Sequence, residues 1–166
     1  MKKKILISTG GSGGHVIPAT VFYDQLKEKF DVILSTDKRG VNFLDIDKYE
    51  VNIINTPKLS SNFFLMPISL FYLFFVTIKS ILFLRIKKIN ILISTGGYMS
   101  VPLCLAAKIL NIKIYLFEPN MVLGRANNFF LKFSEKIFCY SSKIISFPKK
   151  YFNKIILIEP LLRKEF

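Results

Sequence analysis

The heptapeptide ILISTGG occurs twice in this sequence, at residues 5–11 and again at residues 91–97. Each copy is a short apolar run that stops at two glycines, and such runs are typical of buried parallel strands that lead into tight loops. Further apolar runs follow the same pattern, at residues 31–36, 51–55, 113–117, 136–140 and 155–158. Stretches with helical character lie between the runs, at residues 17–30, 67–88, 101–110 and 124–133. This alternation predicts an α/β fold, a Rossmann-like parallel sheet with helices on both faces.

The composition fits one compact domain. The 166 residues are 51% hydrophobic, with a mean hydropathy of +0.40, so the chain can bury enough apolar surface to offset the entropy lost on folding. Lys and Arg number 24 against 11 Asp and Glu, which gives a net charge of +13. An AT-rich genome explains part of this charge, because 20 of the basic residues are Lys. The remainder suits anionic membranes or phosphorylated substrates.

Several classes of protein are excluded or disfavoured. The two cysteines, Cys104 and Cys139, are too few for a disulfide scaffold or a zinc module, so no metal site is expected. Aromatic residues do not alternate with basic residues as they do in RNA-binding proteins, and no nucleic-acid partner is expected. The apolar run after residues 1–4 is too short for a signal peptide, which indicates a cytoplasmic protein.

The first glycine loop, STGGSGGH at residues 8–15, follows a predicted strand and precedes a predicted helix. Its glycines allow the backbone to approach a ligand closely, and the helix N-terminus favours an anion, above all a diphosphate. A P-loop would end in Gly-Lys-Ser/Thr, whereas this loop ends in Gly14-His15-Val16. The dinucleotide-binding fingerprint has a third glycine where Val16 stands, so a dinucleotide site, with Asp37 after the second strand, is the less favoured alternative.

Polar residues near the ends of other strands complete the candidate site. His15 is the only histidine and is placed to act as a neutral base or hydrogen-bond donor, although a lone histidine is often structural. The second loop, STGGYMS at residues 94–100, is expected to form a facing wall that carries Tyr98. Glu118 and Asn120 follow the strand at residues 113–117, and Glu118 is either a site residue or an ordinary loop or capping residue.

Residues 60–78 carry no charge, so a transmembrane helix has to be considered. A single crossing would separate the two ILISTGG strands, which belong in one sheet, and this argues against a membrane span. A helix that begins at Pro67 instead places a row of apolar residues on one face: Phe71, Phe75, Ile78, Leu82 and Ile86. We expect one side of the helix to pack on the sheet. The remainder, with residues 63–66 and the basic flank that includes Lys79, either lies in a membrane interface or is buried by a partner domain.

Three motifs together resemble one known family. STGGSGGHVIPA at residues 8–19 is similar to the GGTGGHxxPa loop of the MurG family, bacterial transferases that add N-acetylglucosamine to the undecaprenyl-diphosphate-MurNAc-pentapeptide known as lipid I. STGGYMSVP at residues 94–102 resembles the second glycine loop of that family, GGYxSxP. FEPNMVLGRANNFF at residues 117–130 resembles its HEQNxxxGxxNxxl stretch. The motifs occur in the order that the family has.

The resemblance implies a GT-B glycosyltransferase of two Rossmann-like domains, of which this chain is the N-terminal half. The N-terminal domain of the family takes lipid I at the cytoplasmic face of the inner membrane as a peripheral protein, and the C-terminal domain binds UDP-GlcNAc. The family's transfer inverts the anomeric configuration and needs no metal or cofactor.

The resemblance also implies roles for individual residues. The catalytic residues are then His15 and Glu118. The residues around the acceptor and its diphosphate are then Thr9, Gly10, Gly11, Ser12, Gly13, Gly14, Gly96, Gly97, Tyr98, Asn120 and Asn127. The membrane patch comprises Phe71, Phe75, Ile78, Lys79 and Leu82, and Arg163 is a donor-side contact.

The sequence also departs from the family. Phe117 stands where the family has His, and Pro119 where it has Gln. Residues 159–163 keep the Arg of the family's GNPVR motif but not its Gly-Asn, and the sequence ends at Phe166. We therefore expect a single acceptor domain over residues 1–166, without the domain that binds UDP-GlcNAc. Three hypotheses stay open: the acceptor half of a MurG-type enzyme, the membrane-docking subunit of a split UDP-GlcNAc transferase, and a non-catalytic module that binds a lipid diphosphate or a nucleotide.

Overall fold

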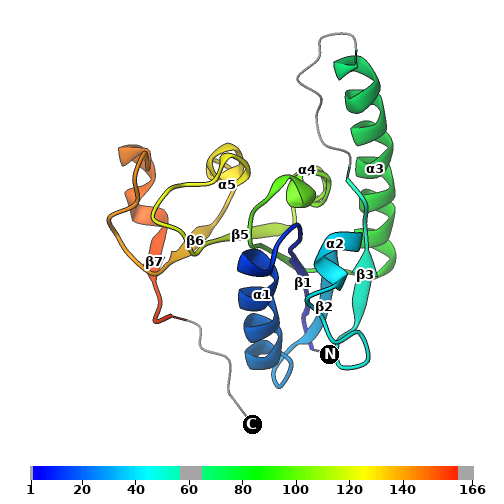
Figure 1. The fold of residues 1–166 in the computed structure, drawn as a ribbon, viewed down its shortest axis with the longest axis horizontal. Helices are drawn as coiled ribbons and strands as arrows, with labels where there is room; N and C mark the ends of the chain where they lie inside the picture. Colours follow the sequence, from blue (N-terminus) through cyan, green and yellow to red (C-terminus); the bar gives the residue numbers. More distant parts are fainter. Residues whose placement is uncertain (1, 57–64, 161–166) are drawn as a thin grey trace.

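The computed structural model describes residues 2–56 and 65–160. A seven-stranded sheet forms the centre of the fold (Figure 1). Its strands, in chain order, are β1 (Lys4–Ser8), β2 (Asp31–Thr36), β3 (Val51–Ile53), β4 (Ile91–Ser94), β5 (Lys113–Glu118), β6 (Lys136–Cys139) and β7 (Ile155–Leu157). All neighbouring strands are parallel, and their order in the sheet is β3-β2-β1-β4-β5-β6-β7. The predicted parallel α/β sheet is confirmed.

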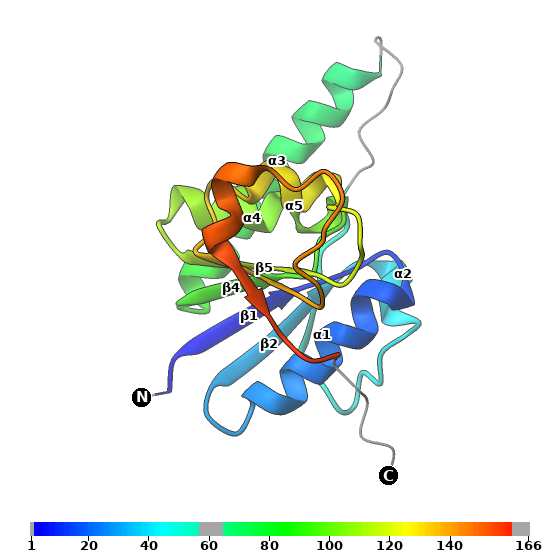
Figure 2. The same ribbon diagram turned by 90° about the vertical axis from the view of Figure 1, so that its left-hand side faces the viewer.

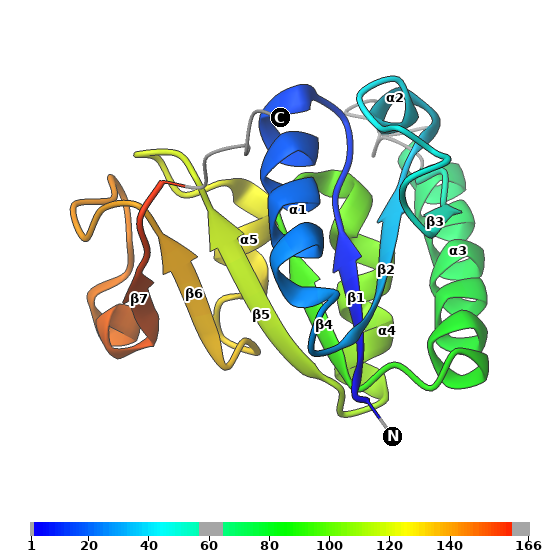
Figure 3. The same ribbon diagram turned by 90° about the horizontal axis from the view of Figure 1, so that it is seen from below.

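Helices cover both faces of the sheet (Figures 2 and 3). The α-helices are α1 (Gly13–Leu26), α2 (Lys38–Val41), α3 (Met66–Ile86), α4 (Val101–Ile109) and α5 (Arg125–Phe130), and two short 3₁₀ helices are η1 (Tyr98–Ser100) and η2 (Lys149–Lys154). In Figure 2, α1 lies below the sheet, and α4 and α5 lie above it. The fold is therefore doubly wound, as the alternation of strands and helices predicted.

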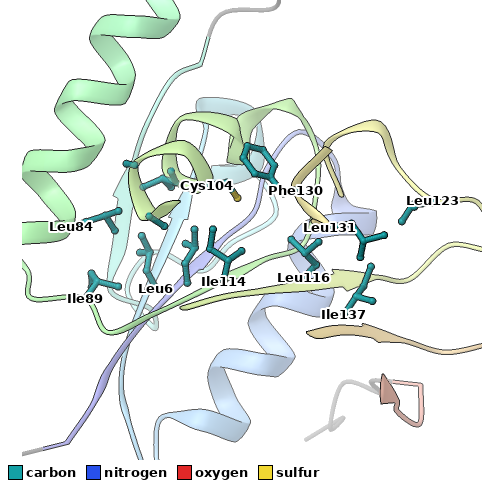
Figure 4. Packing of buried hydrophobic residues seen from close by; sticks show 14 of the residues in the cluster. Leu6, Leu84, Ile89, Cys104, Ile114, Leu116, Leu123, Phe130, Leu131 and Ile137 are labelled. Atoms are coloured by element: carbon teal, nitrogen blue, oxygen red, sulfur yellow. The ribbon is translucent and has the colours of Figure 1, made fainter. Parts of the chain in front are cut away.

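The core forms two layers because successive strand residues point to opposite faces of the sheet. Ile5 and Ile7 belong to the layer between the sheet and α1, with Phe22 and Phe117. Leu6, between them in the sequence, belongs to the other layer, whose side chains lie between the sheet and the helices on that side (Figure 4). Continuous apolar runs such as ILI are thus explained by a strand that is buried on both faces.

The two ILISTGG copies lie side by side in the sheet. Ile5, Leu6, Ile7 and Ser8 of β1 pair in register with Ile91, Leu92, Ile93 and Ser94 of β4. The chain order reverses between these two strands, because β2 and β3 lie on one side and β5 to β7 on the other. Ligands of doubly wound sheets bind at such a switch point, outside the carboxyl ends of the strands. Both glycine loops begin there.

Helix α3 leaves most of its apolar surface exposed. The residues with buried side chains are Val76, Thr77, Ser80 and Leu84. The hydroxyl groups of Thr77 and Ser80 donate to the carbonyl oxygens of Leu73 and Val76, at 2.8 Å each, so they are buried at little cost. The buried side packs mainly against α4, and Leu84 also belongs to the core cluster that contains Leu6 and Leu92 of the sheet. The N-terminal half of α3 extends beyond the body of the fold (Figure 1).

By length and composition alone, α3 is apolar enough to cross a membrane, and 22% of its most apolar window is buried. It connects β3 with β4, and both strands belong to one sheet. A span through α3 would place parts of that sheet on opposite sides of the bilayer, so the premise of the argument against a crossing, that both ILISTGG strands belong to one sheet, is confirmed. Residues 57–64, which include the first part of the uncharged segment and the start of the apolar lead-in, lie outside the described residues.

Two helices differ from the sequence prediction. Helix α1 begins at Gly13 rather than at residue 17, so the last glycines of the loop form its first turn. Glycine and proline are both poor helix formers, and α1 has glycines in its first turn and Pro18 in its second. Local propensity therefore misplaces the start of the helix. Helix α2 was not predicted, because a helix of four residues has no apolar periodicity.

Candidate functional site

The first glycine loop leaves an open helix N-terminus at the switch point. Ser12 is the N-cap of α1 in an extended conformation, and its side chain makes no capping hydrogen bond. The first turn of α1 contains no acidic residue. Because the first N–H groups of a helix have no intrahelical acceptor, this end of α1 is suited to an anion. Gly11 has a φ of +87°, a conformation that favours glycine.

Asp37 ties this loop to the end of β2. Its side chain is 6% exposed, and Oδ1 accepts the N–H groups of Gly11 at 3.0 Å and Gly40 at 2.9 Å. Oδ2 accepts Nε of Arg39 at 2.9 Å. Burial alone would raise the pKa of Asp37, but these hydrogen bonds outweigh burial and lower it. Both oxygens are thus used within the chain, which disfavours the alternative in which Asp37 holds the ribose of a dinucleotide.

The second glycine loop packs directly against the first. The N–H of Thr95 donates to the carbonyl of Ser8 at 3.0 Å, and its hydroxyl donates to the hydroxyl of Thr9 at 2.9 Å. Gly96 and Gly97 have φ values of +89° and +79°. Tyr98 follows in η1, and its hydroxyl accepts a hydrogen bond from Arg39. The equivalent threonines of the two ILISTGG copies therefore join the two loops.

His15 bridges the two loops. Its Nδ1 lies 2.7 Å from the carbonyl oxygen of Thr95. A carbonyl oxygen only accepts, so Nδ1 carries the proton, and in the neutral imidazole Nε2 is left with a lone pair. The sequence placed His15 at the end of the first loop, but nothing in the sequence identified Thr95 as its partner. This contact fixes the tautomer that a general base at Nε2 requires.

Glu118 and Asn127 organise the loop that follows β5. Oε1 of Glu118 accepts the side-chain amide of Asn120 at 2.9 Å. Oε2 accepts the N–H of Gly124 at 2.8 Å and Nδ2 of Asn127 at 3.0 Å. Glu118 is 2% exposed. The carboxylate is thus held by the chain on both oxygens, a geometry that fits a positioning role. Its predicted catalytic role stays a prediction.

Asn127 also lies directly beneath the second loop. A Cβ at Gly96 would stand 3.1 Å from Nδ2 of Asn127, and the φ of +89° at this position also favours glycine, so a side chain here would require Asn127 to shift. Nδ2 also donates to the carbonyl of Phe117 at 3.0 Å, whereas the buried Oδ1 has no hydrogen-bond partner among the described residues. Phe117 itself is fully buried and packs against Phe22 and Tyr140, so at this departure from the motif a core ring stands in place of a polar residue.

The structure thus brings together most of the predicted site residues: those of the two glycine loops, His15, Glu118, Asn120 and Asn127. The predicted membrane residues form no part of this cluster, because they lie on α3. Arg163 lies outside the described residues. Within residues 2–56 and 65–160, no group of three or more His, Cys, Asp or Glu side chains is placed to hold a metal ion. Sequence reasoning missed Arg39, whose only signal was its position two residues after Asp37.

Known proteins resemble the chain in sequence. The model of the glycosyltransferase family 28 N-terminal domain matches residues 5–139. The UDP-N-acetylglucosamine–N-acetylmuramyl-(pentapeptide) pyrophosphoryl-undecaprenol N-acetylglucosamine transferase of Pelagibacter ubique is 58% identical over 166 residues, which are 100% of this chain and 47% of that protein. The protein of the same name from Rickettsia prowazekii is 34% identical over 98% of this chain and 42% of its own length. The chain thus spans about half the length of these relatives.

Solved structures resemble the chain in fold. MurG of Acinetobacter baumannii superposes with a TM-score of 0.78 at 22% identity, over 93% of this chain and 45% of that one. A UDP-GlcNAc 2-epimerase from Neisseria meningitidis bound to UDP-GlcNAc has a TM-score of 0.61 at 15% identity, over 93% and 46%. At such identities the likeness concerns the fold alone. The match over residues 5–139 decides the family: the chain belongs to glycosyltransferase family 28, through that family's N-terminal domain.

Proposed function

We propose that this chain is the acceptor-binding part of a MurG-type glycosyltransferase, which transfers N-acetylglucosamine from UDP-GlcNAc to lipid I. The names of the sequence relatives supply the donor and the acceptor. One observation carries the proposal for this chain: Nδ1 of His15 contacts the Thr95 carbonyl, and this leaves Nε2 with a lone pair at the junction of the two glycine loops.

The acceptor diphosphate is assigned to the first loop. Gly13 and Gly14 form the first turn of α1, which has neither a capping side chain nor an acidic residue, and both features favour an anion. Gly10 and Gly11 keep the loop free of side chains, and the N–H of Gly11 is already used by Asp37. Thr9, Ser12 and the second-loop residues Gly96, Gly97 and Tyr98 complete the proposed wall. Asn120 and Asn127 hold the neighbouring loop through Glu118.

In the proposed reaction, Nε2 of His15 accepts the proton of the acceptor sugar hydroxyl. The hydroxyl oxygen then forms a bond to the anomeric carbon of GlcNAc from the face opposite UDP. The bond from this carbon to the phosphate oxygen breaks, UDP leaves with the electron pair, and the configuration inverts. Thr95 contributes its carbonyl oxygen, which holds the imidazole in place. We assign no metal ion or cofactor to this step.

The donor UDP-GlcNAc is assigned to a second domain that is not part of residues 1–166. This division rests on the chain's match to about half the length of its relatives. Residues 1–166 then act as one acceptor domain, and a donor-side contact by Arg163 belongs to the junction with the second domain.

The same proposal places the protein on the cytoplasmic face of the bacterial inner membrane, as a peripheral protein. Helix α3 offers exposed apolar residues for this contact, among them Phe71, Phe75, Ile78 and Leu82. Lys79 on the same helix is exposed as well and is suited to anionic headgroups.

The test of the function is transfer of labelled GlcNAc from UDP-GlcNAc to lipid I by a protein that joins this chain to a donor domain. His15→Ala is expected to lower kcat by about 10²-fold or more, because it removes the base. His15→Asn keeps a side-chain N–H that can donate to the Thr95 carbonyl but supplies no base, so it should be as inactive as His15→Ala. Near wild-type kcat in either variant contradicts the role of His15, and no transfer by the unmodified protein contradicts the proposed activity.

A further inference from the structure

The side chain of Arg39 lies between the two glycine loops. Its Nε donates to Oδ2 of Asp37 at 2.9 Å, and its Nη2 donates to the hydroxyl of Tyr98. Its Cζ lies 5.5 Å from the centre of the Tyr98 ring. A Cβ placed on Gly11 would stand 3.7 Å from Nη2. The guanidinium is therefore held by one residue from each side of the switch point and lies beside the first loop.

The guanidinium keeps donors that the chain does not use. Arginine has five N–H groups, and these contacts engage one on Nε and one on Nη2. Among the described residues, no hydrogen-bond partner is found for Nη1. The side chain is 51% exposed, so the unused donors are accessible. A guanidinium presents its donors in a rigid fork, which suits phosphoryl oxygens better than a flexible ammonium does.

The support beneath Arg39 is rigid. Asp37 caps α2 through its contact with the N–H of Gly40, and it also holds the N–H of Gly11. A Cβ on Gly40 would stand 2.0 Å from the hydroxyl of Thr36, so this turn requires glycine. Asp37 has these two backbone partners besides Arg39, so replacing Arg39 leaves Oδ1 hydrogen-bonded while Oδ2 loses its contact with the guanidinium.

We propose that Arg39 binds the oxygens of one phosphoryl group of the acceptor diphosphate, while the N-terminus of α1 binds the other. This inference rests on the proposed function, because it assigns a further binding residue to the same site. Two separate anion-binding groups on either side of Gly11 make the site selective for a diphosphate over a single phosphate. Arg39 is then a specificity-determining residue, which positions the acceptor for His15.

The test measures binding of inorganic pyrophosphate and inorganic phosphate to the 166-residue chain by calorimetry at fixed ionic strength. Arg39→Gln is expected to weaken pyrophosphate binding by about tenfold, as for a charged hydrogen bond at an accessible site, and to change phosphate binding by less than about twofold. Arg39→Lys keeps the charge but not the fork, and should fall between Arg39→Gln and the wild-type chain. Far-UV circular dichroism checks that the variants are folded.

The matched control is Lys38→Gln, which removes one positive charge from the neighbouring exposed position of α2. It should change both affinities by less than about twofold. Equal losses of phosphate and pyrophosphate binding in Arg39→Gln, or equal effects of Arg39→Gln and Lys38→Gln, overturn the proposal and leave only a general effect of charge. Absence of pyrophosphate binding by the wild-type chain overturns it as well. The transfer assay with the His15 variants reports on the proposed function independently of these outcomes.

Discussion

At the scale of single residues, the site depends on atoms that already have partners. The carboxylate of Glu118 accepts hydrogen bonds on both oxygens, and the N–H of Gly11 is bound to Asp37. Such groups hold the loops in place rather than contact a ligand. Among the described residues, the atoms that stay available include Nε2 of His15, the first N–H groups of α1 and part of the Arg39 guanidinium. The chemistry proposed here uses these three.

Glu118→Gln separates a structural from a catalytic role of this residue. The new amide places N–H donors where one carboxylate oxygen now accepts, opposite either Asn120 or the pair Gly124 and Asn127. We expect the free energy of unfolding of the 166-residue chain, measured with urea, to fall by about 1–3 kcal/mol, the usual effect of unsatisfied buried polar groups. Unchanged stability together with a large loss of transfer in the two-domain protein would contradict the positioning role and support the catalytic one.

At the scale of elements, α3 buries two hydroxyl side chains against the protein and presents its largest apolar side chains to solvent. Thr77 and Ser80 are buried against the body of the fold, whereas Phe71 and Phe75 are exposed and contact each other, with ring centres 4.7 Å apart. Large exposed apolar patches on soluble domains mark sites of contact with membranes or other proteins. The position of the patch on a protruding helix is consistent with the proposed membrane contact (Figure 1).

Flotation with liposomes tests the membrane contact. Phe71→Ser with Phe75→Ser is expected to reduce binding to phosphatidylglycerol vesicles by at least about tenfold, because burial of each ring contributes roughly 2 kcal/mol. Lys79→Glu should reduce binding to these vesicles severalfold, since one basic residue contributes about 1 kcal/mol at an anionic surface, and should have less effect on phosphatidylcholine vesicles. The control, Phe152→Ser, removes an exposed ring on η2. If all variants bind as the wild-type chain does, a partner domain rather than a membrane covers α3.

At the scale of the whole molecule, residues 2–56 and 65–160 form one doubly wound sheet whose switch point carries both glycine loops. The relatives are about twice as long as this chain. In the proposed two-domain arrangement, the second domain would supply the donor to this edge of the sheet. The loops of the proposed acceptor site can therefore be held by hydrogen bonds within this chain, while the proposed reaction still requires the second domain.

The isolated 166-residue chain is accordingly expected to transfer no GlcNAc from UDP-GlcNAc to lipid I. Fusing the C-terminal half of the Pelagibacter ubique relative after Phe166 should produce transfer, which is measured as labelled GlcNAc in the lipid fraction. The chain carrying His15→Ala in the same fusion serves as the background. Transfer by the isolated chain would contradict the assignment of the donor to a second domain.

Much of this arrangement was predictable from the sequence. The apolar runs of the ILISTGG copies predicted β1 and β4, and the spacing of strands and helices predicted the parallel sheet. Glycines marked the loops at their carboxyl ends, and the motifs of residues 8–19, 94–102 and 117–130 indicated the family. These features are local, because propensity and periodicity depend on residues close to one another in the chain.

Only the tertiary structure decided which residues meet. The Thr95 carbonyl reaches His15 across 80 positions, and Arg39 reaches Tyr98 across 59, because β4 lies beside β1 at the switch point. The buried face of α3 was decided in the same way, by its packing against α4. Contacts of this kind depend on the order of the strands, which is set by how the whole core packs and which no local pattern encodes. The sequence by itself thus determined the strands, the longer helices and the glycine loops, and the packing of the sheet determined the site.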